Sequence, residues 1–291
     1  MGLTIKELIP IGEKILKDAG VEEYKIDAES LISFQIGFDK QKLFMNWTYD
    51  VDDARCEAYF DLVNRRAAGE PLQYITNEQY FMGHRLYVDP AVLIPRPETE
   101  ALAEKAIEHL RAHPDVKAVL DLCTGSGALA ISIAKACPHA KITAADVSEK
   151  ALAVAMKNAS ALGAAGRIDF VLSDLFSGIK RGAFGKRFGL IVTNPPYIQT
   201  DGLTGLQREI RDHEPLMALD GGADGLDFYR RIAAEAPGCM RSGACIMAET
   251  GWGQAHDAAA IFEAAGFTGA GVFKDLAGRD RIIMMHWIKA D

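Results

Sequence analysis

Between residues 118 and 193, short apolar runs alternate with longer stretches in which apolar residues recur every three or four positions. The apolar runs are rich in β-branched residues and predict four buried strands, at residues 118–122, 141–145, 168–172 and 190–193. The first two intervals predict helices at residues 128–136 and 148–162. Such an alternation is typical of an α/β domain built on a parallel sheet.

The pattern continues towards the C-terminus. A helix, a strand and a helix are predicted at residues 225–236, 244–249 and 254–265. Two further β-prone runs, at residues 271–273 and 281–285, predict an antiparallel pair that closes the sheet.

The N-terminal pattern is helical throughout and predicts a small bundle. Thr4 and Glu7 form a capping-box sequence, and the first helix should stop at Gly20. Asp27 is expected to open a second helix, which ends near Gly37. A third helix is predicted at residues 39–47.

Asp52 is expected to cap a fourth helix that ends at Gly69 and turns Ala54, Ala58 and Leu62 inward, with Phe60 and Val63 as further candidates for this face. The bundle lacks the residue types of a catalytic constellation, so we expect it to dock a substrate.

A connector follows the bundle. Two β-prone runs around Gly83 predict a hairpin within residues 80–88. Pro95 and Pro97 hold Arg96 in extended backbone, and Pro97 suits the first turn of a helix. We therefore expect a helical substrate-docking domain at residues 1–77, a β-hairpin connector at 78–95 and the α/β domain at 96–291.

Composition narrows the function classes. The 291 residues carry a formal net charge of -8, which argues against a protein whose affinity comes from neutralising a nucleic-acid backbone. The five cysteines include no C-x-x-C pair and the histidines no H-E-x-x-H pattern, so we expect reduced thiols and no metal site. No apolar stretch approaches the roughly 20 residues of a membrane span, and no signal-peptide core is present. A cytoplasmic protein is expected.

Each of the four predicted strands ends in candidate site residues. The first is followed by a loop of small residues, the second by one acid, the third by an acid and two apolar residues, and the fourth by an asparagine-diproline-tyrosine sequence. These residues are Cys123, Thr124, Gly125, Ser126 and Gly127; Asp146; Asp174, Leu175 and Phe176; and Asn194, Pro195, Pro196 and Tyr197. Carboxyl ends of parallel strands lie along one rim of a sheet, where ligands bind in α/β proteins.

Taken singly, these signals are weak. Asn194 to Tyr197 alone could be a strand that stops at a Pro-Pro turn. The glycine loop lacks the third glycine of the dinucleotide pattern, because Ala130 stands in its place. Asp146, about 20 residues beyond the loop, is placed where a carboxylate can accept hydrogen bonds from ribose hydroxyls. Together the four strand ends predict a nucleoside-binding site with a clamp beside it.

In these motifs the chain resembles S-adenosylmethionine-dependent methyltransferases with a seven-stranded Rossmann-like sheet. It looks most like the peptide chain release factor glutamine N(5)-methyltransferases, the HemK/PrmC family. The segments that carry this resemblance are residues 69–75, 93–100, 121–127, 194–198, 214–215, 218–219 and 224–229. The first two are specific to the family, whereas Asn-Pro-Pro-Tyr is shared with methyltransferases of nucleic-acid amino groups and of a ribosomal-protein glutamine.

The resemblance implies a reaction and its participants. A methyl group would pass from S-adenosyl-L-methionine, leaving S-adenosyl-L-homocysteine, to the glutamine amide of the Gly-Gly-Gln motif in class I peptide chain release factors. We expect a monomer that supports translation termination without binding nucleic acid directly.

The resemblance also assigns roles to the strand ends. Cys123 to Gly127, Asp146, Asp174, Leu175, Phe176 and Asn194 would bind the cofactor, with Asp146 on the ribose and Asp174 on the adenine amino group. Asn194 to Tyr197 would bind the substrate amide, with Asn194, Pro195 and Tyr197 catalytic: the Asn194 oxygen and the Pro195 carbonyl accept its two N–H groups, and Tyr197 packs on its plane.

The chain departs from its relatives at three positions. Cys123 replaces a common glycine, Thr250 replaces a common histidine, and Leu175 replaces an aromatic residue near the adenine, so that stacking would come from Phe176.

Several other readings stay open on sequence grounds. A glutamine methyltransferase of a ribosomal protein and an adenine-amino nucleic-acid methyltransferase share the tetrapeptide, although the latter should carry a basic target-recognition region. A non-catalytic nucleotide-binding module would not need Asn194 and Tyr197. A dehydrogenase is disfavoured by the missing third glycine and by the absence of a catalytic histidine or Tyr-Lys arrangement.

Overall fold

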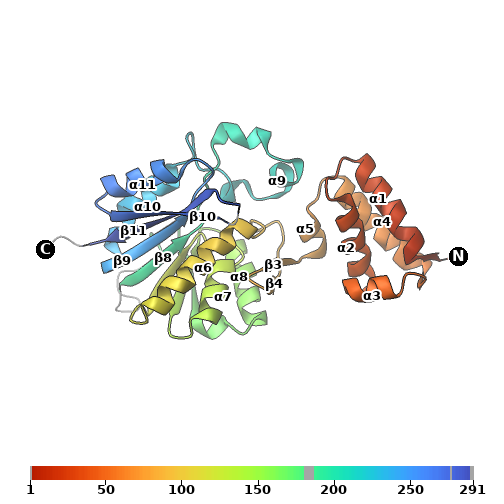
Figure 1. Ribbon diagram of the computed structural model, residues 1–291, viewed down its shortest axis with the longest axis horizontal. Coiled ribbons are helices and arrows are strands. Elements are labelled where there is room, and N and C mark those ends of the chain that lie inside the picture. The colour runs from red at the N-terminus through yellow and green to blue at the C-terminus, as the bar shows by residue number, and fades with distance from the viewer. Residues whose placement is uncertain (1, 180–186, 276, 289–291) are drawn as a thin grey trace. The chain divides into compact units, whose positions relative to one another are not determined.

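The computed structural model describes residues 2–179, 187–275 and 277–288 (Figure 1). The chain forms two compact units: residues 1–78 together with 207–213, and residues 79–206 together with 214–291. The return of residues 207–213 to the first unit was not apparent from the hydrophobic pattern.

The first unit is helical. It contains α1 (Ile5–Asp18), α2 (Tyr24–Ile36), α3 (Lys40–Met45), α4 (Asp53–Ala67), α5 (Leu72–Thr76) and the distant α9 (Arg208–His213). Two short strands, β1 (Leu3–Thr4) and β2 (Asp50–Val51), add an antiparallel ladder that the pattern did not predict. The Glu7 carboxylate accepts the Thr4 backbone N–H at 2.8 Å, and Gly37 ends α2 with a φ of 70°. These two helix boundaries confirm the predictions.

Two predictions for the bundle were wrong. Helix α2 begins at Tyr24, so Asp27 is not its cap but a buried residue of its first turn, where it accepts a hydrogen bond from Arg66 Nε at 2.6 Å. The buried stripe of α4 consists of Cys56, Tyr59, Val63 and Arg66, so that the candidate Val63 is buried whereas Ala54 is exposed. The inward face is shifted because Arg66, a residue that the pattern counted as polar surface, pairs with Asp27 and with Glu209 of α9.

The second unit opens with the expected hairpin of β3 (Gln79–Phe81) and β4 (His84–Leu86). Its two turn residues, Met82 and Gly83, both have positive φ, the geometry that matches the twist of a two-residue hairpin. The Met82 backbone N–H donates to the Glu100 carboxylate in the first turn of α6 (Pro97–Ala112), where Pro97 occupies the first helical position. The hairpin is thereby fastened to the start of that helix.

The core of this unit is a seven-stranded sheet in the order β10-β11-β9-β8-β5-β6-β7. The five strands from β9 to β7 are parallel, and β11 is antiparallel to both of its neighbours. Their bounds are β5 Ala118–Leu122, β6 Lys141–Asp146, β7 Ile168–Leu172, β8 Phe188–Thr193, β9 Met240–Glu249, β10 Thr268–Lys274 and β11 Asp280–Trp287. The predicted α/β class and its seven-stranded sheet are confirmed.

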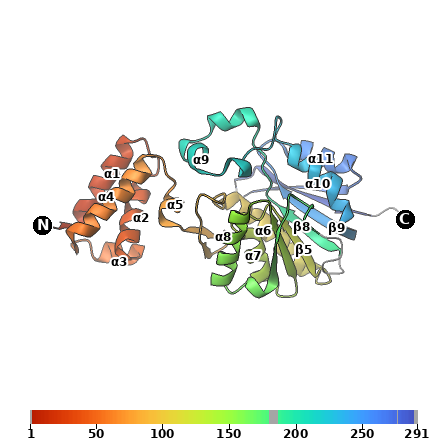
Figure 2. The same ribbon diagram turned by 180° about the vertical axis from the view of Figure 1, so that it is seen from behind.

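Helices cover both faces of the sheet (Figure 2). Helices α6, α7 (Ala128–Ala136) and α8 (Glu149–Ala161) pack on one face, and α10 (Asp227–Glu235) and α11 (Ala255–Ala264) on the other. Successive strand residues pack on opposite faces of the sheet: Val119 packs with α6, α7 and α8, and Leu120 packs with α10 and α11. The chain order reverses between β5 and β8, so their carboxyl ends flank a switch point at which ligands bind in such sheets.

Candidate active site

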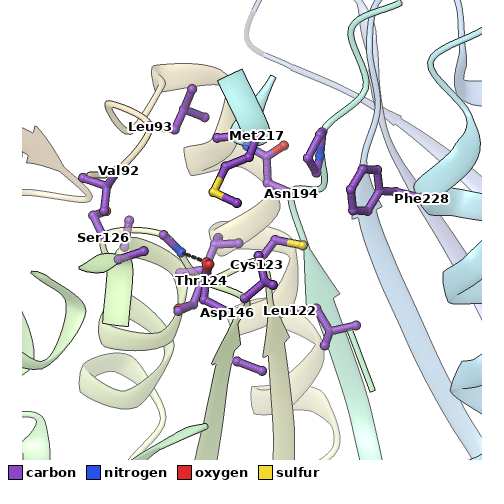
Figure 3. A pocket seen from close by; sticks show the side chains of 18 of the residues that line it. Val92, Leu93, Leu122, Cys123, Thr124, Ser126, Asp146, Asn194, Met217 and Phe228 are labelled. Atoms are coloured by element: carbon purple, nitrogen blue, oxygen red, sulfur yellow. Dashed lines mark hydrogen bonds between the residues drawn. The ribbon is translucent and has the colours of Figure 1, made fainter. Parts of the chain in front are cut away.

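A cavity opens at the carboxyl ends of β5, β6 and β8 (Figure 3). Its empty volume, including the space open to solvent, is ≈ 970 Å³. Nine of the predicted site residues line it: Cys123, Thr124, Gly125, Ser126, Asp146, Asp174, Leu175, Asn194 and Pro196. Gly127, Phe176, Pro195 and Tyr197 do not line it.

The loop after β5 is held from beneath by a buried acid. Asp121 Oδ2 accepts hydrogen bonds from Thr124 Oγ1 at 2.6 Å and from the Ala130 backbone N–H at 3.1 Å. Asp121 is fully buried, and this burial raises its pKa to about 7. Cys123 has a φ of 59°, a left-handed conformation that favours glycine, the residue expected there from the resemblance.

Gly127 contributes by its lack of a side chain. A Cβ there would lie 3.1 Å from the Ala155 Cβ of α8, and its φ of 82° is again left-handed. Gly127 therefore lets α8 pack closely against the start of α7, although it does not itself face the cavity.

Asp146, at the end of β6, holds the rim of the cavity. Its Oδ2 accepts the Gly125 backbone N–H at 2.9 Å, and its Oδ1 accepts that of Ser148 at 3.0 Å. Burial raises the pKa of the carboxyl group in spite of these bonds. Each oxygen has a further lone pair for a ligand donor.

At the third strand end, Asp174 and Leu175 line the cavity and Phe176 does not. Leu175 is buried with a φ of 47° and lines the cavity, and Asp174 also lines it while its Oδ1 accepts from Arg231 Nη2 at 2.8 Å. Phe176 packs against the sheet core and is not part of the lining. The cavity lining instead contains the aromatic ring of Phe228 from α10, which Figure 3 shows to the right of Asn194.

The backbone after Asn194 is clamped by a neighbouring segment. The Ile198 backbone N–H donates to the Leu219 carbonyl at 3.0 Å, and Gly221 N–H donates to the Ile198 carbonyl at 2.7 Å. A Cβ at Gly221 would lie 2.9 Å from the Pro196 carbonyl oxygen and 2.7 Å from the Tyr197 Cα. Only glycine permits this approach, so the conformation of the tetrapeptide depends on residues 219–221.

The Asn194 carboxamide projects into the cavity, and its nitrogen is held there. Asn194 Nδ2 donates to Thr99 Oγ1 of α6 at 3.2 Å. Tyr197 turns away from the cavity, with its hydroxyl 3.4 Å from Glu249 Oε1. Glu249, the last residue of β9, is buried, and this burial raises its pKa to about 7.

Arg96 is neutralised within the protein. Its guanidinium binds the carboxylate of Glu214, which also accepts the Ile94 backbone N–H at 3.2 Å. In the described part of the chain, the charged side chains that line the cavity are Arg96, Asp146 and Asp174. With Arg96 paired to Glu214 and Asp174 paired to Arg231, Asp146 is the charged residue of the described lining that has no ion-pair partner. Its carboxylate favours a cationic nucleoside over the pyrophosphate of a dinucleotide.

Several residues of the site were missed in the sequence. Asn158 of α8 is buried. Its Oδ1 accepts the Tyr87 backbone N–H at 2.7 Å, and its Nδ2 donates to the backbone carbonyls of Tyr87 and Ser126, both at 2.9 Å. Thr99 and Phe228 reach the cavity from helices that the pattern treated as packing elements. The available signal was a polar residue next to apolar ones: Asp121 lies in an otherwise apolar strand, and Glu249 follows the apolar run 244–248.

Two absences apply to the residues that the structure describes. Within them, no group of three histidine, cysteine or acidic side chains is arranged to hold a metal ion. No helix among them is long and apolar enough to cross a membrane. Thr250, the third departure from the relatives, is buried, and its backbone exchanges hydrogen bonds with Arg281.

The class of protein follows from four features: a mostly parallel sheet with this strand order, a glycine turn after β5, an acid after β6 and Asn-Pro-Pro-Tyr after β8. Together they define a methyltransferase. Residues 100–211 match the family model of the methyltransferase small domain, and residues 7–76 match that of the PrmC N-terminal domain. A solved structure with this fold is the T. thermophilus 16S rRNA methyltransferase RsmC in complex with AdoMet and guanosine. It has 18% identity and a TM-score of 0.50, over 72% of this chain and 49% of that one.

Curated relatives identify the family. The release factor glutamine methyltransferase of Geobacter sulfurreducens is 40% identical over 96% of this chain and 95% of its own length. That of Clostridium acetobutylicum is 36% identical over 97% of this chain and 98% of its own. The chain belongs to the release factor glutamine methyltransferase family, which confirms the resemblance drawn from its motifs.

Proposed function

We propose that this protein methylates the side-chain amide nitrogen of the glutamine in the Gly-Gly-Gln motif of class I peptide chain release factors. The observation that carries the proposal is the Asn194 carboxamide, which projects into the cavity with its nitrogen bound to Thr99. Its oxygen is thereby left to accept an N–H of a substrate amide or amine. The sequences of full-length relatives favour glutamine as the source of that N–H.

We infer S-adenosyl-L-methionine as the methyl donor and S-adenosyl-L-homocysteine as the product. When bound, this cofactor supplies a methyl group made electrophilic by a sulfonium centre. The residues that would hold it are the loop from Cys123 to Gly127, Asp146 at the ribose, Asp174 at the adenine amino group, and Leu175. Phe228 takes the place in the lining that was expected for Phe176. The Asp146 carboxylate and the absence of an unpaired cation among the described lining residues fit a positively charged ligand without phosphates.

The protein has to overcome the weak nucleophilicity of an amide. The nitrogen lone pair is delocalised into the carbonyl. It therefore attacks the methyl group only when the amide is oriented towards it and the nitrogen is made more electron-rich. In our proposal Asn194 Oδ1 and the Pro195 carbonyl accept the two N–H groups, and Pro196 lines the amide site. Tyr197, which does not line the cavity, supports the tetrapeptide through the contact of its hydroxyl with Glu249. The nitrogen would form the new C–N bond as the bond between the methyl carbon and the sulfonium sulfur breaks, and it would afterwards release one proton to solvent. Orientation and electrostatics therefore supply the rate gain, to which well-placed reactants can contribute about 7–11 kcal/mol.

The helical unit is proposed to dock the protein substrate. Its support is that residues 207–213 belong to this unit, while the next residue, Glu214, braces Arg96 in the cavity wall. Exposed apolar side chains such as Phe34 and Met45 are available on it. Replacing both with glutamate should raise the KM for a whole release factor and leave kcat and cofactor binding unchanged. We further propose that the enzyme is a cytoplasmic monomer that does not bind nucleic acid directly.

The test is methyl transfer from labelled S-adenosylmethionine. Purified release factors, ribosomal proteins and DNA are offered in parallel, and the modified residue is located by mass spectrometry. Label on the glutamine of a release factor supports the proposal. Label on a ribosomal-protein glutamine or on an adenine amino group would replace it with one of the two alternatives that share the tetrapeptide.

A further inference from the structure

One side chain from the loop after β9, that of Gln254, holds the backbone of the Asn-Pro-Pro-Tyr segment. Gln254 Nε2 donates to the Tyr197 backbone carbonyl at 3.0 Å, and Gln254 Oε1 accepts the Gly251 backbone N–H at 3.0 Å. The Gln254 backbone is itself fixed, because its carbonyl accepts the Ala258 N–H of α11 at 2.9 Å. These two side-chain hydrogen bonds, the Gln254 bridge, therefore tie Tyr197 to the start of a helix.

The two partners of the Gln254 carboxamide have fixed polarity. A backbone N–H can only donate and a backbone carbonyl can only accept, so the position requires one acceptor and one donor side by side. A carboxamide supplies both in one planar group, and its partners settle its orientation. A glutamate of the same shape would turn an oxygen towards the Tyr197 carbonyl, and a methionine would satisfy neither backbone group.

Two glycines make room for the Gln254 bridge. A Cβ at Gly225 would lie 2.4 Å from the Tyr197 carbonyl oxygen and 2.5 Å from Gln254 Nε2. A Cβ at Gly251 would lie 2.3 Å from Gln254 Oε1 and 3.1 Å from Tyr197 Cδ2. Three separate stretches of the second unit thus meet closely around one hydrogen bond, which leaves the Tyr197 carbonyl little freedom to move.

The proline pair explains why the segment needs this support. Pro195 and Pro196 have no backbone N–H, so no hydrogen bond from their own nitrogens can hold this stretch. Their rings fix φ, but a residue before a proline keeps a ψ range of about 40°, and ψ sets the direction of the carbonyl group. The sheet holds the chain up to Thr193, and the Gln254 bridge holds it again at Tyr197. The direction of the Pro195 carbonyl depends on both of these ends.

We propose that Gln254 is a positioning residue that fixes Tyr197 and thereby directs the Pro195 carbonyl at the substrate amide. This inference rests on the proposed function, in which that carbonyl accepts one of the two substrate N–H groups. Gln254 is not among the described residues that line the cavity, so it acts through the backbone without touching either reactant. Its loss should lower kcat and leave cofactor affinity unchanged, because the strand ends proposed to hold the cofactor stay in place.

The experiment compares Gln254→Met and Gln254→Glu in the full-length enzyme acting on a release factor. Both substitutions keep the length of the side chain. We expect Gln254→Met to lower kcat about tenfold, the value of one orienting hydrogen bond, with the cofactor Kd unchanged in calorimetry. At alkaline pH, Gln254→Glu should lose at least as much turnover, because its carboxylate opposes the Tyr197 carbonyl oxygen.

The Gln254→Glu variant adds a pH readout that a merely structural residue would not give. A protonated carboxyl group can donate its O–H to the Tyr197 carbonyl and so restore the bridge. Partial burial beside a carbonyl oxygen raises the pKa of an introduced carboxyl group above its ordinary value. The kcat of this variant relative to wild type should therefore recover about tenfold between about pH 8 and about pH 5.

Gln199→Glu is the matched control. Gln199 is exposed, lies two residues beyond Tyr197, and has its Nε2 at 3.5 Å from the Asp224 carbonyl oxygen. The substitution adds the same charge near the segment without touching the Gln254 bridge, so its kcat relative to wild type should stay constant with pH. Titratable side chains on the surrounding segments are present in every variant, so the ratio to wild type cancels their effect; they include Asp224 and Asp227, both paired with Arg230, and Tyr197, Glu249, His256 and Asp257.

Three results would overturn the inference. They are equal turnover of wild type and Gln254→Met, a pH profile of Gln254→Glu that runs parallel to that of the wild type, and a loss of cofactor affinity in both variants. Should the wild type label another amide or amino substrate instead of release factors, the proposed function fails, and the same variants test the positioning role on that substrate.

Discussion

The carboxylate of Asp146 offers the sharpest test of where the cofactor lies. Its two oxygens already accept the Gly125 and Ser148 backbone N–H groups, at 2.9 and 3.0 Å, so the side chain is fixed and presents its remaining lone pairs at the cavity. Two hydroxyl donors of a ribose would find a charged acceptor at no further cost in side-chain entropy. Asp146→Ala removes that acceptor.

The expected loss of binding free energy follows from the number of hydrogen bonds that Asp146 makes to the ribose. Hydrogen bonds to a charged group contribute about 1.5–3 kcal/mol each, so two of them amount to at least about 3 kcal/mol. The raised pKa of Asp146 shows that its charge is partly desolvated, which places the net effect at the lower end of this range. A loss of about 3 kcal/mol weakens binding about 100-fold.

Isothermal titration calorimetry of S-adenosylmethionine and S-adenosylhomocysteine measures this loss and its cause. If Asp146 binds the ribose, both ligands lose affinity equally, because the ribose is common to them. If it acts through attraction of the sulfonium charge, only S-adenosylmethionine loses. The matched control is Asp169→Ala, which removes an exposed acid from the neighbouring strand β7 and should leave both Kd values unchanged. An unchanged Kd in Asp146→Ala would refute the assignment.

Three further predictions address other parts of the site. Asn194→Ala should abolish methyl transfer and leave cofactor affinity intact in calorimetry; normal turnover would contradict the proposed mechanism. Gly221→Ala should lower kcat at least about tenfold, because its Cβ would collide with the Pro196 carbonyl and the Tyr197 backbone, and retention of full activity would show that this contact is dispensable. Asp121 has a pKa raised by burial to about 7, so the folded state binds its proton more readily than the unfolded state does. Its contribution to stability is therefore complete below about pH 4 and is lost as the pH rises through 7. Denaturant unfolding of Asp121→Asn should show a flatter pH dependence than the wild type in this interval, and an equal slope would exclude Asp121 as its source.

The amino-acid sequence by itself determined the layered α/β domain, the hairpin and most helix boundaries. These features depend on signals local to a few residues: apolar periodicity, caps such as Asp52, and prolines such as Pro97. The alignment of the four strand ends also followed, because successive parallel strands must place their carboxyl ends on one rim. The candidate residues Asn194 and Asp146 were therefore identified without coordinates.

Tertiary structure alone decided which polar groups meet. Thr99 and Asn194 are 95 positions apart, and Arg96 and Glu214 are 118 apart. The hydrophobic periodicity around each of these residues does not indicate which distant residue it contacts. The same reason explains the two errors in the bundle, since the burial of Asp27 and Arg66 depends on their pairing with each other and with Glu209 from a distant segment. Polar burial is stable only when partners from separate elements converge, so it is determined by packing geometry rather than by local pattern.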